Sequence, residues 1–269
     1  MTTSVLPDAA VPMKRSRLRR SIGDAMVVTE RNLIGYVRIP ESLFFSSVQP
    51  IMFVLLFRYV FGGAIATPGM DYVDYLMAGI FVQTVMFGSI NTSIGLAEDL
   101  QKGLIERFRS LPMARSAVLA GRTTSDLLRN VVVIVIITLV GFAVGFRIHT
   151  NAAAFLGAVL LMLFFAYALS WGFAYIGLSA PNSEVAQLMA FPILFPLTFA
   201  STAFVPSSTM PSWLRVFAEH QPVSLVINSV RALTQGGETA RWVIPALIWC
   251  AALLALFAPL AVWRYRRVT

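Results

Sequence analysis

Few residues in this chain could do chemistry, and their spacing matches no nucleotide-binding or catalytic pattern. The phosphate-binding loop G-x-x-x-x-G-K-S/T is absent, and no such loop precedes either of the two lysines, Lys14 and Lys102. The G-x-S-x-G turn that carries a nucleophilic serine is also absent. Cys250 is the single cysteine, which excludes a disulfide framework and a cysteine metal site. The sequence therefore predicts a chain that is not an enzyme and binds no cofactor itself.

The histidines and carboxylates are dispersed as well. His149 and His220 fall outside the long apolar stretches, and Asp71, Asp74 and Glu184 lie at their edges. His220 fits a proton relay or, as we favour for a lone histidine near a tryptophan, an interfacial hydrogen-bonding residue. An ion-coupled carrier keeps an ionisable residue near the middle of the membrane, and we expect none there. If the chain takes part in energy-driven transport, we therefore expect the energy to come from outside the membrane-spanning segments.

The composition places the chain in a lipid bilayer. Of its 269 residues, 57% are hydrophobic and 13% are charged, and the mean hydropathy is +0.74, beyond the range of soluble globular domains. The formal net charge of +8 could indicate nucleic acid, but the basic residues flank apolar segments and form no single patch with interleaved aromatics. We therefore expect these charges to contact membrane lipid, and we expect no nucleic-acid partner.

Six apolar stretches are long enough to cross a bilayer as helices. A helix rises about 1.5 Å per residue, so about 20 apolar residues span the hydrocarbon core. The predicted fold is an all-α integral membrane protein, with a single transmembrane domain over 21–269. The six predicted spans are 43–61, 72–96, 127–146, 152–179, 185–205 and 242–263.

The distribution of lysine and arginine predicts which side of the membrane each loop faces. Cytoplasmic loops of membrane proteins are enriched in these residues. Fifteen of them fall on the side of the N-terminus and four on the other side. Arg58 and Arg129 are left out of this count, because each lies near an end of a predicted span, where a long side chain reaches the headgroups. We therefore expect a plasma-membrane protein with both termini in the cytoplasm.

The N-terminal region combines a basic tail with an amphipathic segment. Residues 1–20 are predicted to be a disordered basic tail. Acidic residues such as Asp24 and Glu30 interrupt the apolar stretch that follows, which argues against a cleaved signal peptide. Apolar residues recur at helical spacing from Ile22 to Val37 and predict a helix over 21–39 that lies on the membrane surface. A soluble tail helix is the alternative.

The segment between the second and third predicted spans carries the most specific pattern in the chain. Apolar residues at i, i+4, i+8 and i+11, from Leu100 to Leu111, predict a short helix over 98–111, and Pro112 ends it. A helix that projects from the membrane between two spans needs a surface to dock against. Two interpretations stay open, namely docking on another protein and lying on the lipid surface.

A polar segment over 206–241 separates the last two predicted spans. Pro211 and Pro222 suit the first turns of two short helices. Each of these helices has an apolar face, and Gly236 and Gly237 end the second one. We expect an external re-entrant helical hairpin that dips into the outer leaflet.

Two segments of the chain resemble the ABC-2 type permeases, and within them the daunorubicin/doxorubicin-resistance exporter permeases. The first segment is DLQKGLIERFRSLPMARSAVLAGR at 99–122, and the second is FVPSSTMPSWLRVFAEHQPVS at 204–224. The predicted spans and the amphipathic N-terminus extend the resemblance over nearly the whole chain.

This resemblance implies a subunit of an ATP-driven exporter. Segment 98–111 would be a cytoplasmic coupling helix in a groove of a separate ABC ATPase, which binds ATP and Mg, and 21–39 would touch the same partner. Two permease chains, as a homodimer, would assemble with two ATPase chains. The residues implied in ATPase docking are Glu98, Asp99, Leu100, Lys102, Leu104, Ile105, Glu106, Arg107, Phe108, Arg109, Leu111 and Pro112. The residues implied in an external gate are Trp213, Phe217, His220 and Pro222.

Aromatic and uncharged polar residues on two predicted spans could line a path for an amphiphilic substrate. Helix packing explains the same residues equally well, because small and polar residues also hold spans together. Both interpretations stay open. The residues are Phe81, Gln83, Phe87, Asn91, Phe195, Phe199 and Ser201.

The leading expectation is a permease that exports a hydrophobic drug or a lipid-like molecule. Export of a glycolipid or polysaccharide precursor by the same architecture is the alternative. A membrane scaffold and an intramembrane enzyme are the expectations from other classes of protein. The absence of catalytic patterns argues against the enzyme, and a dedicated coupling helix argues against the passive scaffold.

Overall fold

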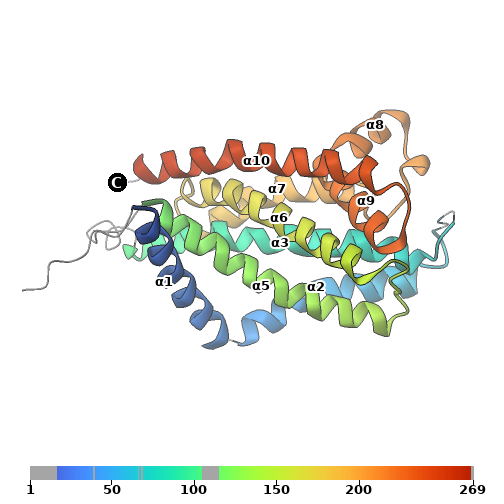
Figure 1. The fold of residues 1–269 in the computed structure, drawn as a ribbon, viewed down its shortest axis with the longest axis horizontal. Coiled ribbons are helices and arrows are strands. Elements are labelled where there is room, and N and C mark those ends of the chain that lie inside the picture. The colour runs from blue at the N-terminus through green and yellow to red at the C-terminus, as the bar shows by residue number, and fades with distance from the viewer. Residues whose placement is uncertain (1–16, 39, 66, 68, 105–114, 268–269) are drawn as a thin grey trace, which may run out of the picture.

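The computed structural model describes residues 17–267 apart from 39, 66, 68 and 105–114. All regular structure in this part of the chain is helical, as predicted. The long helices run side by side as a bundle (Figure 1). The elements are α1 (Arg17–Arg38), α2 (Pro40–Leu56), the π-helix η1 (Phe57–Phe61), α3 (Tyr72–Gln101), α5 (Arg115–Ala143), α6 (Ala152–Gly177), α7 (Ser183–Phe199), the 3₁₀ helix η2 (Ser207–Thr209), α8 (Ser212–His220), α9 (Pro222–Gln235) and α10 (Thr239–Arg267).

Four of the described helices, α3, α5, α6 and α10, are long and apolar enough to cross a membrane. Two further apolar helices are shorter, over Ser46–Phe61 and Ser183–Phe199. The second of these contains Pro192 and Pro196, and each proline removes a backbone donor from the helix. The two shorter helices lie where the first and fifth spans were predicted.

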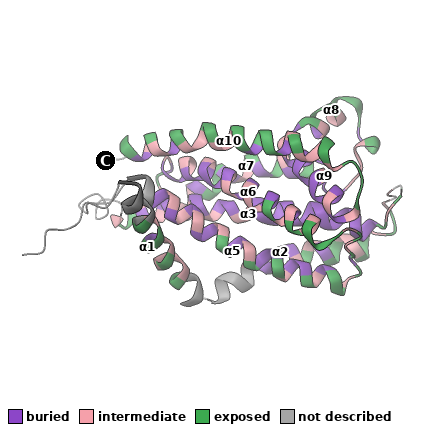
Figure 2. Ribbon diagram, in the orientation of Figure 1, coloured by how far each residue is buried: buried purple, intermediate pink, exposed green. Residues whose placement is uncertain are grey.

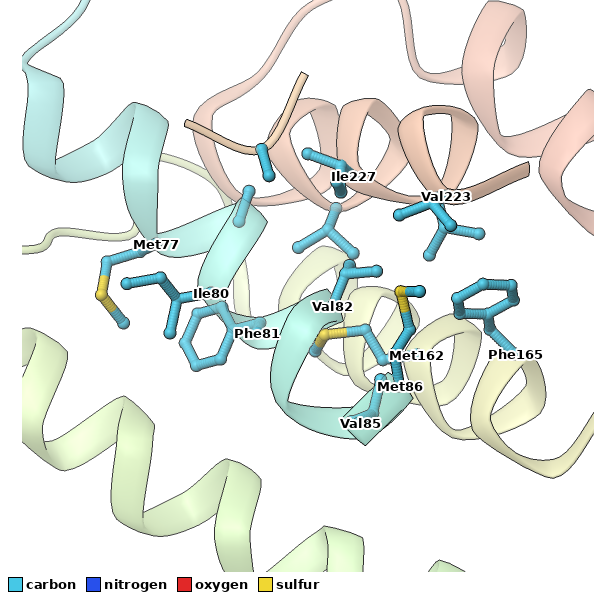
Figure 3. Close-up of a cluster of buried hydrophobic side chains, with 14 of the residues drawn as sticks. Met77, Ile80, Phe81, Val82, Val85, Met86, Met162, Phe165, Val223 and Ile227 are labelled. Atoms are coloured by element: carbon cyan, nitrogen blue, oxygen red, sulfur yellow. The ribbon is translucent and has the colours of Figure 1, made fainter. Parts of the chain in front are cut away.

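α3 forms the centre of the bundle. Its residues from Tyr72 to Met86 are buried without interruption, and buried positions concentrate inside the bundle (Figure 2). Figure 3 shows side chains of α3, such as Met86, beside Phe165 of α6 and Val223 of α9. A helix that is buried on all sides needs no polar face, which explains why α3 has no amphipathic pattern.

The bundle has two different ends. α1, the last turn of α10 and the end of α3 lie together at one end, which we call the α1 end (Figure 1). α8, α9 and the beginning of α3 lie at the opposite end, which we call the α9 end (Figure 1). Three arginines of the last turn of α10 lie at the α1 end, namely Arg264, Arg266 and Arg267.

α1 is attached to the bundle along α5. Thr29 Oγ1 donates to the carbonyl of Gly121 at 3.1 Å, and Asn32 Nδ2 donates to Ser125 Oγ at 3.2 Å. The remaining surface of α1 includes an exposed apolar face, which suits contact with lipid. The exposed apolar residues of this face are Met26, Val27 and Ile34.

Several helix boundaries differ from the predicted ones, and α5 shows the largest difference. α5 begins at Arg115 instead of residue 127, and its polar first half packs into the protein, where Ser125 and Asp126 are buried. α7 ends at Phe199, and 200–205 follow an irregular path. α1 begins at Arg17, so 17–20 are helical and do not belong to a disordered tail. The rest of that predicted tail, 1–16, lies outside the described residues.

Candidate functional site

A cavity of about 260 Å³ lies between α2, α3 and α5. Three residues of the predicted substrate path, Gln83, Phe87 and Asn91 of α3, lie in its wall. α2 adds Gln49 and Phe53 to the wall. The combination of amide groups and aromatic rings suits an amphiphilic ligand better than a purely apolar one.

α5 places a buried arginine in the wall of this cavity. Arg129 lies at the midpoint of α5, and the residue is 4% exposed. Its Nη2 donates to the carbonyl of Gly88 at 2.6 Å. The Arg129 side chain therefore does not reach the headgroups as predicted, because it is buried between α3 and α5. A buried charge on a helix of a membrane protein is costly and is usually kept for function.

Glycines on α3 allow the arginines of α5 to approach closely. Gly88 and Gly95 are two helical turns apart, and so are Arg122 and Arg129 on the facing helix. A Cβ atom at Gly88 would overlap Asn130 Oδ1, and one at Gly95 would overlap the Arg122 guanidinium. The interface between α3 and α5 is thus both polar and close-packed.

Two polar atoms of the cavity wall, Gln83 Oε1 and Asn130 Nδ2, have no hydrogen-bond partner among the described residues. Gln83 is 5% exposed and Asn130 is 2% exposed. Asn130 Oδ1 accepts a hydrogen bond from Arg129 Nη2 at 3.3 Å, which leaves Nδ2 as the remaining donor. Burying such atoms without a partner is costly, so they mark this wall as a place for a polar ligand group.

Polar contacts continue from the cavity toward the α1 end. Arg122 Nε lies 3.7 Å from Asp126 Oδ2, and the same carboxylate oxygen accepts a hydrogen bond from Thr92 at 2.5 Å. Nearer the α1 end, Arg31 Nη2 lies 3.4 Å from Asp99 Oδ2. These contacts connect α1, α3 and α5 between the α1 end and the cavity.

A row of phenylalanines leads away from the cavity along α7 to η1. Ring centroids are 5.8 Å apart for Phe87 and Phe195, 5.6 Å for Phe195 and Phe199, and 5.5 Å for Phe199 and Phe204. Phe204 stacks on Phe57 with centroids 4.4 Å apart. We call these five residues the aromatic row. It joins three residues of the predicted path into one surface.

The two remaining residues of the predicted path lie elsewhere. Phe81 is enclosed in the core and packs edge-on against Phe146, with centroids 5.9 Å apart. Ser201 is buried in the segment after α7, and its Oγ donates to the carbonyl of Thr198 at 2.5 Å. The geometry of Phe81 and Ser201 therefore favours the packing interpretation.

The structure describes the first part of the predicted docking segment. α3 continues to Gln101, so the predicted helix does not begin at Glu98. Lys102 and Gly103 form a turn, and Gly103 has a φ of +66° that glycine adopts readily. Leu104 is again helical. The docking residues outside the described part of the chain are Ile105, Glu106, Arg107, Phe108, Arg109, Leu111 and Pro112.

The predicted gate residues lie at the α9 end. Trp213 and Phe217 are exposed on α8, and His220 Nδ1 lies 2.8 Å from the carbonyl oxygen of Val216. Pro222 begins α9. The apolar face of α8 points away from the protein, as expected for a helix at a membrane surface.

Arg231, which the sequence places in an external loop, has a structural role that sequence reasoning missed. Its guanidinium carbon lies 3.7 Å from the centre of the Tyr75 ring. Nη2 donates to the carbonyls of Tyr75 at 3.2 Å and Thr202 at 3.0 Å. Burial lowers the pKa of the guanidinium, and Tyr75 opposes this shift. Arg231 thereby ties α9 to α3 and to the segment after α7.

Several long apolar helices define a multi-pass membrane protein. The ABC-2 type transporter family matches residues 24–234, and the chain belongs to this family.

Several permeases are similar in sequence to most of this chain. The daunorubicin resistance ABC transporter permease protein DrrB1 of Streptomyces coeruleorubidus is 34% identical over 238 residues, which cover 88% of this chain and 83% of the relative. The probable doxorubicin resistance ABC transporter permease protein DrrC of Mycobacterium tuberculosis is 25% identical over 266 residues, covering 98% and 96%. The doxorubicin resistance ABC transporter permease protein DrrB of the same species is 27% identical over 254 residues, covering 89% and 88%. Such permeases imply an ATP-binding partner.

Proposed function

We propose that this chain is the membrane-spanning subunit of an ATP-driven exporter that moves a hydrophobic drug or lipid-like molecule out of the cell. The observation that carries the proposal is the similarity of nearly nine-tenths of the chain to a drug-resistance permease. The cavity and the aromatic row support an amphiphilic cargo, because they combine hydrogen-bonding groups with apolar rings.

In this proposal six helices cross the plasma membrane. Four are the long helices α3, α5, α6 and α10. The fifth is α2 continued by η1, and the sixth is α7. α7 has 17 residues, which is at the lower end of the range for a transmembrane helix. The α1 end faces the cytoplasm, because the larger share of lysine and arginine lies on that side. α8 and α9 then form the external hairpin and its gate.

The partner supplies the energy in this proposal. Two ATPase subunits bind ATP and Mg, and two copies of this chain form the transmembrane part. The segment that begins at Leu104 docks in a groove of the ATPase as the coupling helix. ATP binding favours one conformation of the assembly over another, and the polar contacts of Arg31 with Asp99 and of Arg122 with Asp126 support a route from the docking segment to the cavity.

Replacing Leu104 by Asp is expected to uncouple transport while leaving membrane insertion intact, and reversing the charges of Glu106 and Arg107 is expected to do the same. A carboxylate in an apolar docking surface is costly to bury, so we expect loss of most efflux, about tenfold or more. The measurements are co-purification with the candidate ATPase, stimulation of its hydrolysis by lipophilic compounds, and efflux from cells.

Ala64→Asp is the matched control for this experiment. It places the same charge in an exposed loop at the α9 end, where no docking is proposed. Normal efflux by well-expressed Leu104→Asp protein would refute the docking assignment. Failure of any lipophilic compound to stimulate hydrolysis by the wild-type assembly would count against the proposed export function.

A further inference from the structure

We propose that the cavity between α2, α3 and α5 binds the acidic, hydroxyl-bearing headgroup of an amphiphile, while the aromatic row holds its apolar part. Arg129 and Asn130 contact the acid in this arrangement, and Gln83 accepts a hydrogen bond from the hydroxyl. The inference rests on the proposed export function for its biological meaning, because it names a class of cargo. The binding itself requires neither ATP nor transport.

The charge in the cavity wall selects an acid. Arg129 lies at the midpoint of α5, and the residue is almost fully buried. Gly88 lets the guanidinium and the neighbouring Asn130 amide come close to α3. A guanidinium in surroundings of low dielectric constant attracts a carboxylate or phosphate much more strongly than it would in water. A cationic or neutral headgroup would lack this interaction.

The unpartnered polar atoms specify the rest of the headgroup. Asn130 Nδ2 is a donor without an acceptor among the described residues, and it adjoins Arg129. A phosphate or carboxylate oxygen would satisfy it. Gln83 Oε1 has no partner among the same residues, and a ligand hydroxyl, which both donates and accepts, would pair with the Gln83 amide in either orientation. An acid that also carries a hydroxyl satisfies both atoms at once.

The size of the cavity explains why only the headgroup fits. A volume of about 260 Å³ is below the range of sites that enclose a drug-sized molecule, which is roughly 300–1,000 Å³. Phe87 belongs both to the cavity wall and to the aromatic row. Phe195 and Phe199, farther along the row, are 45% and 43% exposed. An acyl chain or ring system that leaves the cavity would therefore cover exposed aromatic surface.

Lipid binding to the purified full-length chain with its ATPase partner tests the proposal, with native mass spectrometry as the measurement in a neutral detergent. The probes are myristoyl lysophosphatidylglycerol, which has an acidic headgroup with hydroxyls, and monomyristoylglycerol, which keeps the acyl chain and hydroxyls but carries no acid. We expect about tenfold tighter binding of the first lipid. Glycerol phosphate, the headgroup without the chain, is expected to compete poorly.

Matched variants locate the site. Arg129→Gln is expected to abolish the preference for the acidic lipid, and Arg129→Lys to retain part of it. Gln83→Glu keeps the shape of the wall and the arginine but adds a repelling carboxylate, so it is expected to weaken binding of the acidic lipid alone. Arg241→Gln removes an exposed arginine at the start of α10 and is expected to change nothing.

The proposal is overturned if Arg129→Gln and Gln83→Glu both keep the wild-type preference, or if Arg241→Gln loses it equally. Competition by glycerol phosphate as strong as that by the lipid would overturn the role of the aromatic row. Since no nucleotide is added, failure of binding leaves the proposed export function standing. Loss of export with intact binding would reject the export function and not the site.

Discussion

Arg231→Met is expected to loosen α9 from the bundle and to lower the melting temperature of the purified protein by roughly 10 °C. Met fills much of the same volume but loses the stacking on Tyr75 and the hydrogen bonds to the carbonyls of Tyr75 and Thr202. Cation–π contact contributes about 1–2 kcal/mol when desolvated, and each charge-assisted hydrogen bond about 1.5–3 kcal/mol. Thermal unfolding in detergent measures the effect.

Arg241→Met is the control for this prediction. Arg241 is exposed at the start of α10, where its Nη1 lies 3.2 Å from Glu238 Oε2. An exposed pair of this kind contributes about 0–1 kcal/mol, so the melting temperature should hardly change. Equal melting temperatures for the Arg231→Met and Arg241→Met variants would show that Arg231 does not hold α9 in place.

Asp126→Asn is expected to destabilise the interface between α3 and α5 by about 3 kcal/mol, because it removes a buried carboxylate that faces Arg122. The amide can still accept from Thr92, which contacts Asp126 in the wild type, so the change isolates the charge. We expect a lower melting temperature and less protein in the membrane. The measurements are thermal unfolding and quantification of the membrane fraction.

Glu98→Gln provides the matched control, since it removes the carboxylate of another i, i+4 pair on the same protein. Glu98 Oε2 lies 3.1 Å from Lys102 Nζ, where the Lys102 and Glu98 side chains are 64% and 44% exposed, and such pairs contribute about 0.3–0.5 kcal/mol. We expect a much larger loss of stability from Asp126→Asn than from Glu98→Gln. Similar effects at both positions would mean that burial of the Arg122–Asp126 pair contributes little.

Long apolar runs made most of the fold predictable from the sequence. α6 begins at Ala152, as predicted, because Asn151 accepts a hydrogen bond from the Ala154 amide at 2.8 Å and caps the helix. The start of α5 was predicted too far along the chain, because the charged residues Arg122 and Asp126 made its first turns look like a polar loop. Their mutual contact in the interior depends on the facing helix, which a local pattern does not contain.

The cavity was only partly predictable for the same reason. Gln83, Phe87 and Asn91 were predicted, together with Phe81, from their aromatic and uncharged polar types, and their i, i+4, i+8 spacing puts these three on one face of α3. Arg129 was predicted to reach the headgroups because polar residues precede it and an apolar run follows it. Its burial depends on the facing helix α3, which no local pattern contains. The contribution of α2 depends on tertiary packing and left no local pattern.

We propose that the segment after α3 meets an ATP-hydrolysing subunit on the cytoplasmic side, and cysteine chemistry tests this contact directly. Cys250 is the single native cysteine, so a Cys250→Ser background allows Leu104→Cys and Ala64→Cys to be studied one at a time. Each position can be labelled with a membrane-impermeant thiol reagent and tested for cross-linking to the ATPase.

We expect Leu104→Cys to cross-link to the ATPase, in an amount that changes with nucleotide, and to resist labelling from outside the cell. Ala64→Cys should react from outside and form no cross-link. Labelling of Leu104→Cys from outside would contradict the account, and so would a lack of cross-linking while the ATPase co-purifies.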